Sequence, residues 1–106
     1  MEQYLIPFND MEWMQTAPGI RSKAFLMKEW KLRLVEFSDK FVEEDWCKKG
    51  HIGYVLEGRL NIDFHGAVIA IKAGDALHIP EGEAHKHKPI ISKGERALLV
   101  MFEKSS

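Results

Sequence analysis

Two turns separated by a very short apolar segment lie within fourteen residues, Gly74–His87 (GDALHIPEGEAHKH). A Gly-Asp pair is typical of the first turn, and a Pro-Glu-Gly run is typical of the second. The segment between them is long enough for a strand but not for a helix. A further strand is predicted to begin at Ala84, and His85 and His87 would share one of its faces because side chains alternate along a strand. The stretch therefore predicts β-structure with two imidazoles directed into one cavity.

The rest of the chain also predicts an all-β fold. No segment shows a convincing helical period, and turn signals recur throughout, as is typical of a sandwich or barrel. We expect residues 30–37 to form a half-buried strand whose outer side carries Lys31 and Arg33. Residues 96–103 (RALLVMFE) are apolar on both sides and predict a strand buried inside the fold. A length of 106 residues suits a single domain over residues 1–106.

The N-terminal segment, residues 1–19, is predicted to be extended. Pro7 excludes a central position in a sheet, because proline lacks the N–H that a ladder needs. The segment is therefore expected either to form an edge strand on its own barrel or to be an arm that crosses onto a second subunit.

Charge and composition exclude several classes of partner. Fifteen Lys and Arg against sixteen Asp and Glu leave a net charge of -1, so we expect no binding to nucleic acid or to anionic membranes. The absence of a leader-like start and of a long apolar run predicts a soluble cytoplasmic protein. The single cysteine excludes an internal disulfide and agrees with a reducing compartment.

Within Gly74–His87, four residues resemble the second conserved motif of the cupin family, in which Gly, Pro, Gly and His stand at fixed spacing. Gly74, Pro80, Gly82 and His85 keep every gap of that motif. The asparagine that usually follows four positions later is replaced by Pro89. The resemblance implies a small jelly-roll β-barrel, also called a double-stranded β-helix, in which His85 is a metal ligand. It also favours a homodimer, since cupins commonly dimerise.

The stretch DWCKKGHIGYVLEG resembles the first cupin motif with its ligands exchanged. Alignment on Gly58, with a three-residue gap, places the two usual histidines on Asp45 and Cys47 and the usual glutamate on His51. A four-residue gap would place the histidines on Glu44 and Trp46, which are poorer ligands. The resemblance therefore implies a metal site at Asp45, Cys47, His51 and His85.

Each exchanged residue is itself a competent metal ligand. Nearby lysines and a bound cation would both favour the thiolate form of Cys47. A carboxylate, a thiolate and two imidazoles suit a tetrahedral zinc ion first, with iron, nickel and copper as alternatives. His87 is the candidate proton carrier beside this site.

Three functions remain open at this point. In the first, the metal ion acts as a Lewis acid on a small substrate, and the site keeps an open position if Asp45 is not a ligand. In the second, the barrel binds or senses a small molecule or a metal without turnover. In the third, no metal is bound, and His51, His85 and His87 bind a ligand in the pocket.

Overall fold

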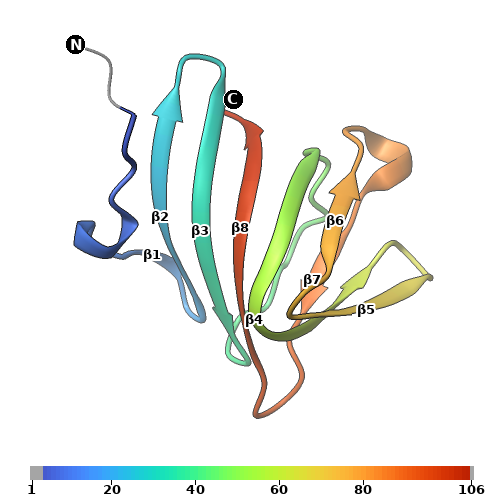
Figure 1. Ribbon diagram of the computed structural model, residues 1–106. Helices are drawn as coiled ribbons and strands as arrows, with labels where there is room; N and C mark the ends of the chain where they lie inside the picture. Colours follow the sequence, from blue (N-terminus) through green and yellow to red (C-terminus); the bar gives the residue numbers. More distant parts are fainter. Residues whose placement is uncertain (1–3, 106) are drawn as a thin grey trace.

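The computed structural model describes residues 4–105, which form a curled antiparallel β-structure (Figure 1). Its elements are, in chain order, η1 (Phe8–Asp10), β1 (Met14–Ala17), β2 (Ile20–Met27), β3 (Trp30–Ser38), β4 (His51–Asp63), β5 (Val68–Lys72), β6 (Ala76–Ile79), η2 (Glu83–His85), β7 (Lys88–Ile90) and β8 (Arg96–Lys104). Both η elements are short 3-10 turns, and none of the described helices is long and apolar enough to span a membrane. The predicted all-β fold is confirmed.

The strand order is β1-β2-β3-β8-β4-β5, and β6 and β7 also pair with β4. β1 pairs with β2 and forms an edge, so part of the segment 1–19 is an edge strand, while its first three residues lie outside the described range. Although β8 comes last in the sequence, it lies between β3 and β4 (Figure 1). This crossover places the last strand beside β3, which lies in the first half of the chain.

β4 curls the sheet because it pairs with different strands along its length. Its first part pairs with β8 and β6, and its last part pairs with β5 and β7. The register against β8 shifts between Val55 and Glu57, and a bulge of this kind bends a strand. Gly58 follows with a φ of +78°, and a Cβ there would lie 1.8 Å from the carbonyl oxygen of Arg96. A glycine is therefore needed at the bend.

The hydrophobic core lies on the concave side of this curl. Val35, Val55 and Leu99 are completely or almost completely buried and come from three neighbouring strands. Around them pack Phe37, Phe41, Leu60, Ile62, Ile71, Ile79, Ile91, Ala97 and Met101. Alternating residues of each strand supply this core, as expected for a sheet with one buried face.

The expected orientation of β3 is wrong. Val35 and Phe37 are buried in the core, so Lys31 and Arg33, which lie on the same side of the strand, also face inward. In the register with β8, Lys31 pairs with Glu103. The two inward cations are tolerated because both lie within ion-pair distance of the buried carboxylate of Glu103.

Candidate functional site

Three potential metal-binding side chains meet on the concave side of the sheet. Cys47 lies before β4, His51 is the first residue of β4, and His87 lies directly before β7. One ligand atom from each lies within 4.8 Å of the others. Cys47 and His87 are also joined by an isolated antiparallel bridge, in which the N–H of each donates to the carbonyl of the other at 2.9 Å. This bridge holds together two segments that are forty residues apart in the sequence.

The two histidines are oriented through their Nδ1 atoms. His51 Nδ1 lies 2.7 Å from the carboxylate oxygen Oε2 of Glu103, and its Nε2 lies 3.6 Å from Cys47 Sγ. His87 Nδ1 donates to the carbonyl oxygen of His85 at 3.0 Å, since a carbonyl can only accept. Nε2 is therefore the nitrogen of each ring that remains for a ligand.

A buried carboxylate, that of Glu103, supports this cluster. It forms ion pairs with Arg33, with Lys31 at 3.9 Å and with His51. Arg33 Nε, His51 Nδ1 and both carboxylate oxygens of Glu103 make no hydrogen bond, so the attraction between these groups is that of ion pairs. Burial opposes ionisation of Glu103, but His51 and Arg33 outweigh it and lower its pKa to about 2. Glu103 is therefore charged at neutral pH and can hold the ring of His51.

The same contacts change the ionisation of Cys47 and His51. The contacts of Cys47 with His51 and His87 lower the pKa of the thiol to about 6 against the opposing effect of burial. For His51, burial would lower the pKa, but Cys47 and Glu103 together raise it to about 9. Without a metal, the pair is therefore a thiolate beside an imidazolium at neutral pH.

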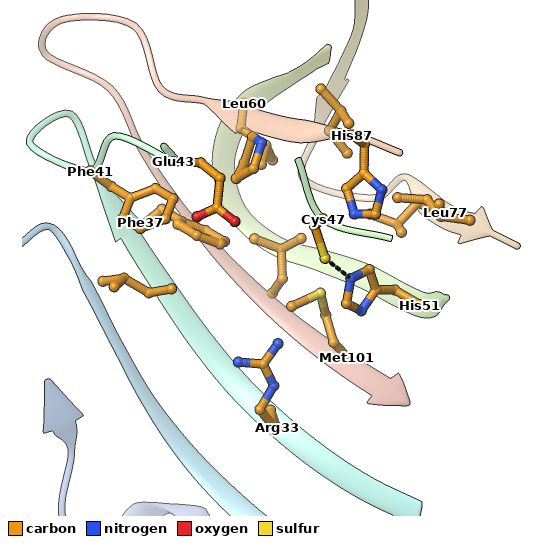
Figure 2. A pocket seen from close by; sticks show the side chains of 15 residues that line it. Arg33, Phe37, Phe41, Glu43, Cys47, His51, Leu60, Leu77, His87 and Met101 are labelled. Carbon is orange, nitrogen blue, oxygen red and sulfur yellow. Dashed lines mark hydrogen bonds between the residues drawn. The ribbon is translucent and has the colours of Figure 1, made fainter. Parts of the chain in front are cut away.

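The cluster forms part of the wall of a cavity of about 210 Å³ (Figure 2). Most of the wall is apolar, and its polar members are Arg33, Glu43, Cys47, His51 and His87. The apolar part consists of Ile20, Phe37, Phe41, Leu60, Ile62, Leu77, Ile79, Pro89, Leu99 and Met101. A few polar groups on an apolar wall are typical of small-molecule sites.

Two of the predicted ligands lie outside this cluster. Asp45 and His85 are both exposed, whereas His51 and His87 are buried. The expectation that His85 and His87 share one strand face is wrong, because Glu83–His85 form the 3-10 turn η2, where side chains do not alternate. The structure thus brings Cys47 and His51 together with His87, the predicted proton carrier, rather than with His85.

Sequence reasoning also missed three polar residues of the site. Glu103 interrupts an otherwise apolar inward row formed with Leu99 and Met101, and a charged residue at such a position was a usable signal. Arg33 was assigned to the wrong side of its strand. Glu43 gave no signal, because it lies among other acidic residues in a segment without regular structure.

The model of the cupin domain matches residues 47–102, which is more than half of the chain and includes all three clustered residues. The chain belongs to the cupin family. None of the curated proteins compared with this cupin matches it significantly.

Solved structures agree with the cupin fold. The polyketide cyclase RemF from Streptomyces resistomycificus superposes with a TM-score of 0.81 at 18% identity, covering 99% of this chain and 81% of its own. KdgF from Halomonas sp. gives a TM-score of 0.76 at 19% identity, and the match covers 100% of this chain and 96% of KdgF. An RmlC-like cupin from Shewanella frigidimarina gives a TM-score of 0.70 at 15% identity, and the match covers 99% of this chain and 93% of that protein. The predicted jelly-roll fold is thereby confirmed.

Proposed function

We propose that this cupin binds a divalent metal ion through Cys47, His51 and His87 and holds a small molecule in the adjoining cavity. The observation that carries the proposal is the convergence of one sulfur and two imidazoles on a cavity wall. Zinc bonds of about 2.3 Å to sulfur and about 2.0 Å to nitrogen, at a tetrahedral angle, separate the two ligand atoms by about 3.5 Å. Cys47 Sγ and His51 Nε2 are 3.6 Å apart.

The atoms behind the cluster also suit a metal. Histidine ligands commonly carry a carboxylate or a carbonyl on the second ring nitrogen, which sets the tautomer and the ring orientation. His51 has the carboxylate of Glu103 in this position, and His87 has the carbonyl of His85. A thiolate with two imidazoles favours zinc first, with copper, nickel and iron as alternatives.

Three protein ligands leave one coordination position for water or for a bound molecule. A metal held there would supply Lewis acidity toward an oxygen of that molecule. The apolar wall limits access of water, and Glu103 keeps the ring of His51 in place. The alternative is a binding module that carries out no reaction. In either function His87 is a metal ligand, whereas the sequence predicted that it would carry a proton.

The test is the metal content of protein purified without added metal. We expect close to one equivalent in the unaltered protein and a loss of most of it in Cys47→Ala and in His87→Ala. Asp45→Asn and His85→Ala are the matched controls, because both residues are exposed and lie outside the cluster. Unchanged metal in Cys47→Ala, or loss of metal in His85→Ala with a folded protein, would overturn the assignment.

A second measurement separates an open site from a closed one. Replacement of the metal by cobalt gives a visible spectrum that reports the coordination number. We expect this spectrum to change when small anions are added, because one position is open. A spectrum that no anion alters would indicate a closed structural site instead.

A further inference from the structure

Positive charge exceeds negative charge around Glu103. Its single carboxylate lies within ion-pair distance of Arg33, Lys31 and His51. Even with His51 neutral, Arg33 and Lys31 share this one carboxylate. Arg33 and His51 line the cavity, whereas the carboxylate of Glu103 does not, so this end of the mostly apolar wall favours an anion.

Arg33 is placed to use this excess. Its Nε contacts Glu103, whereas its two terminal nitrogens donate no hydrogen bond to any residue in the range 4–105. The side chain is 21% exposed and lines the cavity, and Figure 2 shows the guanidinium beside Met101, below Cys47 and His51. A guanidinium keeps its charge at all relevant pH values and offers paired N–H groups that match the two oxygens of a carboxylate. Its unpaired end therefore faces the cavity as a carboxylate anchor.

A carboxylate of the protein limits the other end of the ligand. Figure 2 shows Glu43 pointing into the same cavity beside Phe37 and Phe41, with Arg33 lower in the view. Within the described residues, the Glu43 carboxylate accepts no side-chain hydrogen bond and forms no ion pair. A second carboxylate near Glu43 would be repelled, whereas a hydroxyl or an apolar end would be accepted.

We propose that Arg33 anchors the carboxylate of a small monocarboxylic acid in this cavity, and that Glu43 rejects dicarboxylic acids. The proposal deepens the ligand-binding part of the proposed function and does not depend on the bound metal. The cavity of about 210 Å³ sets the size class. It corresponds to about seven water molecules at about 30 Å³ each, which suits an acid of roughly four carbons.

The experiment uses three matched probes: butyrate, the uncharged butyramide, and succinate, which replaces the methyl end of butyrate by a second carboxylate. Binding is measured by calorimetry with the zinc-loaded protein and again after removal of the metal. We expect butyrate to bind at least about 10-fold more tightly than butyramide, because one charge-assisted hydrogen-bonded contact is worth that much. We expect it also to bind more tightly than succinate, because Glu43 repels the second carboxylate. We expect this preference in both forms of the protein.

Variants assign the preference to residues. Arg33→Gln should remove the preference for butyrate over butyramide. Arg33→Lys keeps the charge beside Glu103 and should retain weaker binding, so it separates loss of binding from failure to fold. Glu43→Gln should reduce the discrimination against succinate, because loss of this charge in the cavity should strengthen succinate binding more than butyrate binding.

Three results would overturn the inference. The first is butyrate binding that is undiminished in folded Arg33→Gln. The second is butyrate binding that is lost on metal removal, since the metal would then be the anchor. The third is a failure of butyrate to bind to protein that carries its metal. By contrast, Arg33-dependent binding by a protein that never takes up metal would support this inference and contradict the proposed metal site, so the two failures are distinguishable.

Discussion

Glu103 Oε2 lies 2.7 Å from His51 Nδ1, and this contact joins the end of the last strand to the start of β4. It follows from strand register. Ile52 of β4 pairs with Phe102 of β8, and the strands are antiparallel, so His51 stands opposite Glu103 on the inner face. Through this one pair, the buried charges of β3 and β8 are coupled to the cluster of Cys47, His51 and His87.

Removal of the Glu103 charge should destabilise the protein strongly. In Glu103→Gln, Arg33 and His51 lose their buried counter-charge, and breaking a buried pair in this way costs about 3–5 kcal/mol. Urea unfolding of the metal-free protein measures the change. The control is Glu57→Gln, which breaks a surface ion pair with Arg96 and should cost no more than about 1 kcal/mol. Equal effects of the two substitutions would contradict the role given to Glu103.

The same variant should bind metal less well. Loss of the partner of a histidine ligand typically weakens metal affinity by about 10–100-fold. Competition with a chelator of known affinity measures this, with Glu57→Gln again as the control. Unchanged affinity in Glu103→Gln would show that the orientation of His51 does not depend on the carboxylate.

Acid should remove the contribution of Glu103. Its pKa is about 2 in the folded chain and near 4.5 in an unfolded one, so its contribution is complete above pH 4.5 and is lost as pH falls toward 2. We therefore expect the difference in unfolding free energy between the unaltered protein and Glu103→Gln to shrink over this interval. A difference that stays constant from neutral pH to the acid limit of the folded state would contradict the lowered pKa.

Cys47 should react as a thiolate at unusually low pH. Only the thiolate is alkylated, so in the metal-free protein the rate with iodoacetamide should rise with a midpoint near the pKa of about 6. In His51→Gln the midpoint should move up toward the ordinary value, because the largest cause of the shift is removed. A midpoint between 8 and 9 in the unaltered protein, roughly the value of a free thiol, would exclude the thiolate–imidazolium pair.

The bend in β4 should depend on Gly58. In Gly58→Ala the new Cβ would meet the carbonyl oxygen of Arg96 at 1.8 Å, and the φ of +78° is itself unfavourable for alanine. We expect a loss of more than about 2 kcal/mol in unfolding free energy. Gly66→Ala is the control, because its φ is also positive but a Cβ there meets nothing within 4 Å. A smaller loss in Gly58→Ala than in Gly66→Ala would contradict the close approach.

The homodimer expected from the sequence stays a prediction. Ile52 and Tyr54, on the convex face of β4, are 57% and 45% exposed, and they adjoin the apolar side chains of Val100 and Phe102. Exposed apolar patches on a sheet often mark an interface. We expect sedimentation to give twice the mass of 12.2 kDa, and the double variant Ile52→Lys/Tyr54→Lys to be a monomer. Val68→Lys, on the edge strand β5, should remain dimeric.

Much of the fold could be predicted because it depends on local pattern. The turns at Gly74 and Gly82 have positive φ values that glycine permits, and a strand occupies the apolar residues between them. Cys47 and His51 were placed in the site from the spacing of the first motif, and both line the cavity. The orientation of β3 was not predictable in this way, because both of its sides carry apolar residues.

The sequence by itself determined the strands and the turns between them, because these features depend on residues close together in the chain, and the resemblance to the first cupin motif indicated Cys47 and His51. Tertiary structure decided that His87 rather than His85 joins Cys47 and His51, and that Arg33 and Glu103 lie behind them. The choice of His87 over His85 depends on the 3-10 turn η2. The placement of Arg33 and Glu103 depends on the pairing of β8 with β3 and β4. Pairings between distant segments are chosen by the burial of the whole core, which no local pattern contains.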